Sequence, residues 1–252
     1  MKITYTGQSG FVIEWDSCFW IFDFAGSRAD DSISRGQLPS LPQEKEGFVF
    51  VSHKHYDHFS YEIFGLRDSF HKINYILDRG IPVRRSIREK YGMSQEETDG
   101  ILRVRAGEKY SLRDPAGNEI RIHAFRSTDC GVAYLLEYCG KTVYHAGDLN
   151  WWIWEEESDQ YNQNMTRNFK EFTLPLERRR IDLAFLPLDY RQGEDYARGF
   201  DYIMKIADVK TAFPMHLWKD FSIIDRLLLD PCSREYRERI VKINCVNESW
   251  IL

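Results

Sequence analysis

Side chains that bind metal ions are concentrated in one short segment of this chain. Residues 53–58 read His-Lys-His-Tyr-Asp-His, so three of the seven histidines and one carboxylate lie within six residues. Imidazole nitrogens and carboxylate oxygens suit zinc or another borderline first-row ion. The spacing allows His53 and His55 to converge on one ion, while Asp57 and His58 turn toward a second. The segment therefore predicts a metal site.

Two later positions share the setting of this segment, a ligand-type residue just after an apolar run. Residues 48–51 precede the histidines, residues 142–144 lead to Asp148, and residues 211–213 lead to His216. Because open α/β sheets form their binding crevices at the carboxyl ends of strands, these side chains are expected to meet. Small residues just before Asp148 would let the backbone approach an ion, and the carboxylate could bridge two ions.

A metal site of this kind indicates a hydrolytic reaction. An ion with an open coordination position lowers the pKa of bound water to about 7, which makes hydroxide available at neutral pH. The same ion polarises a carbonyl or phosphoryl oxygen as the transition state develops. No serine or cysteine nucleophile is then required.

The elements that must position these residues are strands interleaved with helices. Strands are expected at residues 4–13, 19–22, 48–51, 74–77, 102–104, 119–125, 132–138, 142–144, 183–186 and 211–213, and helices near 83–91, 168–172 and 194–206. This order indicates two sheets packed on each other and covered by helices, a four-layer αββα sandwich of the α/β (α+β) class. No linker or internal repeat is visible, so we expect a single domain over residues 1–252.

Composition narrows the classes of partner. The net charge of −5 disfavours broad binding to a phosphate backbone. The five cysteines are odd in number and lack close pairs, which indicates reduced thiols in the cytoplasm. No leader-type segment and no apolar stretch of membrane-spanning length is visible. We therefore expect a cytoplasmic protein with a small-molecule substrate and neither nucleic-acid nor membrane partners; the oligomeric state stays open.

These motifs together resemble the signature of the metallo-β-lactamase superfamily. The matching positions are His53-Lys54-His55-Tyr56-Asp57-His58, Gly147-Asp148 and His216, with Asp23 similar to the early aspartate that supports the histidine loop. Residues 6–11 and 144–148 are most similar to the branch that contains ascorbate-6-phosphate lactonase. The resemblance extends from residue 7 to residue 216. It is specific for fold and metal binding but almost silent on substrate.

The resemblance implies a ligand set and catalytic roles. The implied ligands are His53 and His55 for one ion, Asp57, His58 and His216 for the other, and Asp148 between them. The cofactor would be zinc or manganese, with one or two ions per chain. By the same analogy Asp57 accepts or relays the proton of water and Asp148 positions the hydroxide. The expected reaction is attack of metal-bound hydroxide on a small-molecule ester, lactone or phosphorylated metabolite.

One ligand of the family pattern is missing. The family usually supplies a further histidine to the first ion after the strand expected at residues 120–125, and residues 126–129 read Arg-Ser-Thr-Asp instead. Asp129 could substitute as an oxygen ligand, which would favour a harder ion such as manganese. The alternatives are His123, which lies several residues early, or a position filled by water.

Residues near the expected ligands are candidates for a substrate pocket. Residues 151–154, Trp-Trp-Ile-Trp, could wall a pocket or cover it, or could pack as an ordinary loop. Arg126, Arg191 and Lys219 are candidates for binding an anionic substrate group, whereas His145 is expected to be structural. Two other functions stay open at this point: a nuclease of the same superfamily and a non-catalytic metal-binding or sensor protein.

Overall fold

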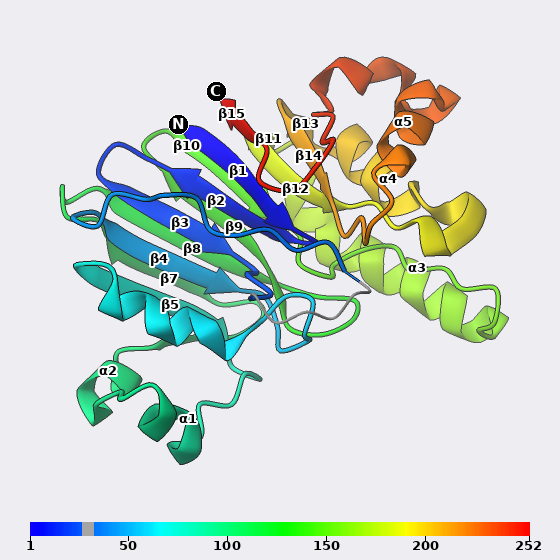
Figure 1. Cartoon of the computed structure of the whole chain (residues 1–252). Coiled ribbons are helices and arrows are strands. Elements are labelled where there is room, and N and C mark those ends of the chain that lie inside the picture. The colour runs from blue at the N-terminus through cyan, green and yellow to red at the C-terminus, as the bar shows by residue number, and fades with distance from the viewer. Residues whose placement is uncertain (27–32) are drawn as a thin grey trace.

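Two β-sheets packed face to face form the centre of the molecule (Figure 1). The computed structural model describes residues 1–26 and 33–252. Within them the first sheet has the strand order β15-β1-β2-β3-β4-β5-β6. Its strands are β1 (Lys2–Gly7), β2 (Gly10–Glu14), β3 (Cys18–Phe22), β4 (Glu46–Val51), β5 (Lys72–Asp78), β6 (Leu102–Val104) and β15 (Ser249–Ile251).

The second sheet has the order β14-β12-β10-β9-β8-β7. Its strands are β7 (Lys109–Arg113), β8 (Glu119–Arg126), β9 (Val132–Tyr138), β10 (Lys141–His145), β12 (Leu183–Pro187) and β14 (Ala212–Met215). Strands β10, β12 and β14 are parallel, so their carboxyl ends reach the same edge. A separate parallel pair joins β11 (Arg180–Ile181) to β13 (Asp208–Val209).

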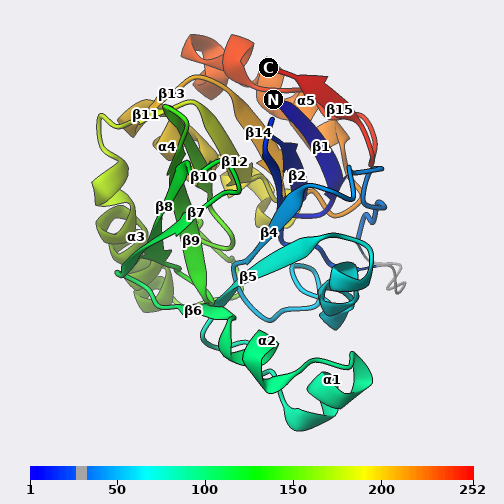
Figure 2. The same ribbon diagram turned by 90° about the vertical axis from the view of Figure 1, so that its left-hand side faces the viewer.

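Helices cover the outer sides of the two sheets (Figures 1 and 2). Beside the second sheet lie α3 (Asp159–Thr173), α4 (Arg198–Ile206) and α5 (Ser222–Leu229). Beside the first lie η1 (Tyr61–Asp68), α1 (Arg85–Lys90) and α2 (Gln95–Asp99). The remaining short helices are η2 (Leu174–Leu176), η3 (Tyr190–Asp195), η4 (Pro231–Glu235) and η5 (Arg237–Arg239). The layers are those of the predicted αββα sandwich, and none of the described helices is long and apolar enough to cross a membrane.

The side chains of β3 show why the sandwich forms. Trp20 and Phe22 point into the core between the sheets, where the Trp20 ring lies 5.2 Å from that of Tyr138 on β9. Phe19 and Ile21 belong to a second core beneath η1. Both faces of the strand are therefore apolar, as expected for a strand buried on both sides. Each sheet needs a helical cover as well as its partner sheet.

The predicted strand at residues 4–13 is wrong as a single strand, because the chain folds there into a β1–β2 hairpin. Gly7 (φ 97°) and Gln8 (φ 49°) are in the left-handed region at the turn. A Cβ atom on Gly7 would lie 2.4 Å from the carbonyl oxygen of Ser34. Apolar and polar residues alternate in β1, whereas β2 reads Gly-Phe-Val-Ile-Glu and is almost entirely buried. The turn-type residues 7–10, Gly-Gln-Ser-Gly, were the available signal for the reversal.

The predicted helices lie in the right regions but have different bounds. The helix near 168–172 is the C-terminal part of α3, which begins after Ser158, whose side chain accepts a hydrogen bond from the Tyr161 N–H. The helix near 194–206 begins later than predicted, at Arg198 of α4, because residues 194 and 195 belong to the separate short helix η3. The elements that were not predicted are β7, β11, β13, β15, α2, α5 and the short helices η1, η2, η4 and η5.

A close backbone approach joins the start of β9 to the end of β4. Gly131 has a φ of 69°, and a Cβ atom there would lie 2.0 Å from the carbonyl oxygen of Ser52. That same carbonyl accepts a hydrogen bond of 3.0 Å from the Val132 N–H. Only glycine fits this junction, which holds residues 127–131 against the histidine segment.

Gly131→Ala should therefore lower the free energy of unfolding more than Gly117→Ala. Gly117 also has a positive φ (83°), but a Cβ atom there would have no other atom within 4 Å. Gly117→Ala should lower the free energy of unfolding by only about 1–2 kcal/mol, because alanine is strained in the left-handed region. Gly131→Ala should lower the free energy of unfolding by about 1–3 kcal/mol more, because its Cβ atom also overpacks the junction. Urea denaturation of both variants checks this; equal losses would contradict it.

Candidate metal centre

The histidine segment begins where β4 ends. The Ser52 N–H and hydroxyl donate to the two carboxylate oxygens of Asp23, at 2.7 and 2.6 Å, and Asp23 directly follows β3. The His58 N–H then donates to the carbonyl of His55 at 3.0 Å. After this turn the imidazoles of His53 and His58 are buried, whereas the His55 side chain is 40% exposed.

A first group of ligand atoms comprises the side chains of His53, His55 and Asp148. His53 Nε2 lies 3.0 Å from His55 Nδ1 and 3.2 Å from Asp148 Oδ2. His53 Nδ1 lies 2.9 Å from the Ser52 hydroxyl, which leaves Nε2 facing the group. Each of the three residues presents an atom that can bind a divalent ion.

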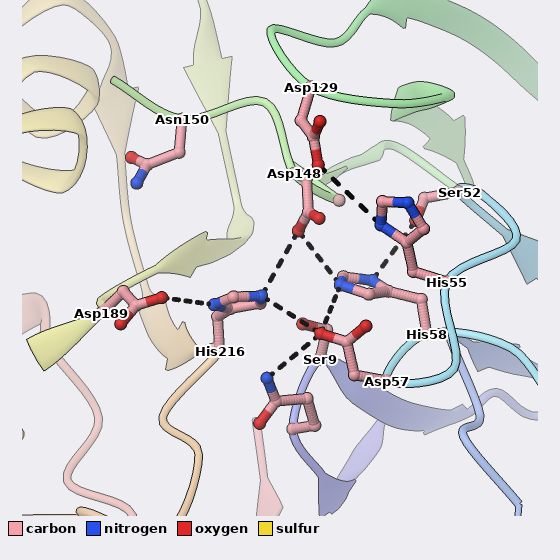
Figure 3. A network of polar contacts seen from close by, with 12 residues as sticks. Ser9, Ser52, His55, Asp57, His58, Asp129, Asp148, Asn150, Asp189 and His216 are labelled. Atoms are coloured by element: carbon pink, nitrogen blue, oxygen red, sulfur yellow. Dashed lines mark hydrogen bonds and ion pairs between the residues drawn. The ribbon is translucent and has the colours of Figure 1, made fainter. Parts of the chain in front are cut away.

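A second group comprises Asp57, His58 and His216, all buried. Asp57 Oδ2 lies 3.5 Å from His58 Nε2 and 3.3 Å from His216 Nε2. His216 follows β14 and has a φ of 63°, so the chain turns sharply at this residue. Residues from two sheets thus meet at one edge of the sandwich (Figure 3).

Asp148 lies between the two groups. Its Oδ2 faces His53, whereas its Oδ1 lies 3.0 Å from His58 Nε2 and 3.6 Å from His216 Nε2. His58 Nε2 and Asp148 Oδ1 are both buried and contact each other as an ion pair, with no other hydrogen-bond partner among the described residues. Both are atom types that bind divalent ions, and neither is committed to a group outside the cluster. The donor set and its geometry therefore suit one or two divalent ions.

Charges within the centre shift its pKa values in a consistent way. Burial by itself would raise the pKa of Asp148 and Asp57, but the charge of His58 and of the neighbouring imidazoles holds both well below the usual range. Burial would lower the pKa of His216, but the charge of Asp148 and the hydrogen bond to Asp189 raise it to about 9. The carboxylates thus demand positive charge here, which protons or metal ions can supply.

Two aspartates orient the histidines from behind. His58 Nδ1 lies 2.8 Å from Asp23 Oδ2, and His216 Nδ1 lies 3.0 Å from Asp189 Oδ2. Such carboxylates hold the imidazole so that Nε2 faces the ion. Sequence reasoning assigned a supporting role to Asp23 but missed Asp189. The available signal was its place just after the apolar run 183–186, the setting that identified Asp148 and His216.

Gln8, at the tip of the β1–β2 hairpin, reaches the centre. Its side-chain amide donates to Asp57 Oδ2 at 3.4 Å and accepts from the Trp218 N–H at 3.0 Å. The backbone carbonyl of Gln8 accepts a hydrogen bond from the backbone N–H of His216 at 2.9 Å. The hairpin overlooked in the sequence therefore ties Asp57 to the loop that carries His216.

Asp129 lies near His55, in the neighbourhood predicted for the missing ligand. Asp129 Oδ2 is 3.9 Å from His55 Nδ1, and Cys130 joins these two in a third cluster of ligand-type atoms. Sequence reasoning did not consider the Cys130 thiol. His123 lies within β8, opposite Leu135 of β9, and belongs to none of the clusters found among the described residues. Of the two predicted side chains, only Asp129 lies near the centre.

Three other residues that the sequence singled out, His145, Gly147 and Trp151, have packing roles outside the ligand groups. His145 is fully buried; its Nε2 donates to the Ser9 carbonyl at 2.9 Å and its ring stacks on Phe22, as expected for a structural histidine. Gly147 approaches the protein rather than an ion, since a Cβ atom there would lie 2.8 Å from that of Ser52. Trp151 packs on Phe169 of α3, away from the pocket wall formed by other residues of its segment.

A pocket of about 450 Å³ opens onto the centre. Its floor includes His55, Asp57, Asp148 and His216. Its walls are mainly aromatic, with Trp152, Trp154, Tyr161 and Trp218 among the lining residues. The volume falls in the range of about 300–1,000 Å³ typical of small-molecule sites.

Comparisons with known proteins identify the fold. No family model matches the sequence, and no curated protein matches it either. Among solved structures, the metallo hydrolase Igni18 from Ignicoccus hospitalis matches with a TM-score of 0.56 at 16% identity, over 100% of this chain and 98% of the other. The metallo-β-lactamase fold protein YhfI from Bacillus subtilis matches with a TM-score of 0.55 at 13% identity, over 99% of both chains. This chain has the metallo-β-lactamase fold.

The proteins that share this fold carry different activities. An isothiocyanate hydrolase from Delia radicum gut bacteria matches with a TM-score of 0.51 at 13% identity, over 100% of this chain and 99% of the other. CmlA, a diiron β-hydroxylase from Streptomyces venezuelae, matches with a TM-score of 0.50 at 13% identity, over 86% of this chain and 44% of the other. Igni18 is named a metallo hydrolase and CmlA a diiron β-hydroxylase, so the fold does not select the metal or the reaction.

Asp189→Asn should weaken zinc binding by about 10–100-fold, because the uncharged amide no longer orients and polarises His216. Asp182→Asn is the matched control: Asp182 is also buried, lies just before β12 where Asp189 lies after it, and pairs with Arg180 instead. Competition with a chromophoric chelator measures both affinities. A similar affinity for the two variants would contradict the assigned role of Asp189.

Zinc binding should release protons at pH 7.5. With a pKa of about 9, His216 is protonated at that pH in the metal-free protein and must lose its proton to bind an ion. Affinity should therefore keep rising until about pH 9. The same raised pKa stabilises the metal-free fold below about pH 6.5, and this contribution is lost as the pH rises through about 9. Calorimetric titration in two buffers of different ionisation enthalpy counts the protons; identical heats would rule this out.

Proposed function

We propose that the protein is a metal-dependent hydrolase that acts on a small-molecule ester, lactone or phosphorylated metabolite. The main support is the setting of Asp148. It is buried with one carboxylate oxygen toward each imidazole group, Oδ1 lies 3.0 Å from the ligand-type atom His58 Nε2, and Asp148 itself lines the floor of a pocket. This arrangement supports a centre of one or two ions to which a substrate has direct access.

The ligand residues and their neighbours divide the work. A zinc or manganese ion held by these residues would acidify a coordinated water and polarise a carbonyl or phosphoryl oxygen. Asp57 contacts Gln8, His58 and His216 through Oδ2, so Oδ1 is the oxygen available, among the described residues, to accept a proton. The low pKa of Asp57 keeps it ionised, which suits a metal ligand or a brief relay of the proton rather than its final acceptor. Asp148 fixes the spacing of the two groups.

The pocket favours a small molecule over a nucleic-acid strand. Its aromatic walls enclose a limited volume, and Arg191 is the only lysine or arginine among the described residues that line it. A nuclease needs a continuous basic surface for the phosphate backbone, and the net charge of −5 gives no support to one. Gln8, within the segment that resembles the lactonase branch, contacts Asp57 and supports that branch as our preferred assignment. The cytoplasmic location stays a prediction.

Activity should depend on the bound ion and on His55. Purified protein is tested against lactones, carboxylic esters and phosphate monoesters with added zinc or manganese, after elemental analysis of its metal content. Chelation should abolish turnover and re-addition should restore it. His55→Ala should reduce turnover at least about 100-fold with the fold retained, because it removes a candidate metal ligand that lines the pocket. His71→Ala, an exposed histidine outside the clusters, is the control.

Other outcomes separate the competing functions. Tight RNA binding that falls steeply with salt, together with cleavage, would assign the chain to the nucleases. Stoichiometric metal with no turnover on any substrate class would support a sensor instead. Iron with oxygen-dependent activity would place it beside the hydroxylase. Each of these results would replace the hydrolase proposal.

A further inference from the structure

One arginine faces the pocket beside the metal centre. Of the three cationic residues that the sequence offered for an anionic substrate group, only Arg191 is among the lining residues. The guanidinium of Arg126 lies 4.9 Å from the ring of Phe172 on α3, and Lys219 is not part of the described lining. The tertiary structure therefore selects Arg191 from the three.

Two contacts fix the orientation of Arg191. Its Nε donates to both oxygens of Asp189, at 2.9 and 3.1 Å, and its Nη2 donates to Asp189 Oδ2 at 2.5 Å. The guanidinium lies over Trp218, 4.0 Å from the ring centroid, and 5.7 Å from that of Trp154. One edge of the fork is thus held by Asp189, while Nη1 makes no hydrogen bond within the described residues. The side chain is 38% exposed, so this second edge is accessible from the pocket.

Arg191 shares its carboxylate partner, Asp189, with two other groups, and Asp57 is a further carboxylate nearby. Asp189 is fully buried and also accepts from His216 Nδ1 and from Trp218 Nε1, at 3.0 and 3.2 Å. A single carboxylate therefore serves an imidazole, an indole and the guanidinium together. A carboxylate or phosphate oxygen at the open edge would make the charge-assisted, fork-type contact that guanidinium groups prefer.

The walls next to Arg191 are apolar. Trp152 and Trp154 stack with ring centroids 5.8 Å apart and an interplanar angle of 5°, and Trp152 lies 5.5 Å from His216. Met165 of α3 also lines the pocket. A ligand here meets a cationic fork at one point and aromatic faces around it, which suits a molecule with one anionic group and an apolar body.

We propose that Arg191 binds the anionic group of the substrate, a carboxylate or phosphate, while the apolar body packs against Trp152, Trp154 and Trp218 and presents its scissile bond to the metal centre. This inference rests on the proposed hydrolase function for the reaction, but the binding it describes does not require turnover. The substrate class is thereby narrowed to small amphiphilic anions.

Binding of three probes tests the inference. Phenylacetate and phenyl phosphate carry the two anionic groups, and phenylacetamide is the neutral counterpart. Titration followed by tryptophan fluorescence uses chelator-treated protein, so that the probes cannot ligate an ion, and is repeated with zinc. At least one anion should bind about 10–100-fold more tightly than the amide, the range of a charged hydrogen bond. The stronger anion identifies the substrate's group.

Variants assign the preference to Arg191. Arg191→Gln should abolish it and Arg191→Lys should reduce it, since lysine keeps the charge but loses the fork. Arg126→Gln, the same change outside the pocket, should bind as the wild type does. Thermal unfolding midpoints show whether each variant is folded. If Arg191→Gln is unfolded, the comparison with wild type is made with Arg191→Lys. Equal binding of anions and amide by wild type, or equal loss in the Arg126 and Arg191 variants, would overturn the inference.

The result is independent of catalysis. Anion binding lost with Arg191, in a protein that hydrolyses nothing, would leave this inference standing and remove the proposed function. Hydrolysis of lactones or esters without an anion preference would do the reverse.

Discussion

The mutual compensation of buried carboxylates and imidazoles at one edge of the sandwich is the constraint on which the site depends. Asp57, Asp148, His58 and His216 are withdrawn from water within a few ångströms of one another. An unpaired charge in this setting would be costly, so every member requires its neighbours or a cation. The same requirement that holds the cluster together makes it a strong attractor for divalent ions.

Such a cluster is possible only because several strand ends meet at the same edge. Asp23 follows β3, the histidine segment follows β4, Asp148 follows β10, and Asp189 and His216 follow β12 and β14. Each chain segment leaves its sheet there, and its backbone is fixed by close contacts such as that of Gly131 with Ser52. The apolar sandwich supplies the rigidity and the loops supply the chemistry.

Asp189 connects the candidate metal centre to the wall of the pocket. It orients His216 on one side and holds Arg191 and Trp218 on the other. The residue that supports a candidate ligand thus also shapes the pocket that would receive a substrate. The fold is shared by hydrolases and a hydroxylase, so the distinctive chemistry of this chain has to be sought in such pocket residues rather than in the sandwich.

The sequence by itself determined the αββα class and the convergence of the histidine segment, Asp148 and His216, because short apolar runs followed by ligand-type residues are a local signal. It carried a turn signal for the β1–β2 reversal in residues 7–10, Gly-Gln-Ser-Gly, but not the contact that places Gln8 beside Asp57. Asp189, Gln8 and the choice of Arg191 over Arg126 were decided by tertiary structure alone. Their roles depend on which loops meet across two sheets, and that proximity leaves no periodic pattern along the chain.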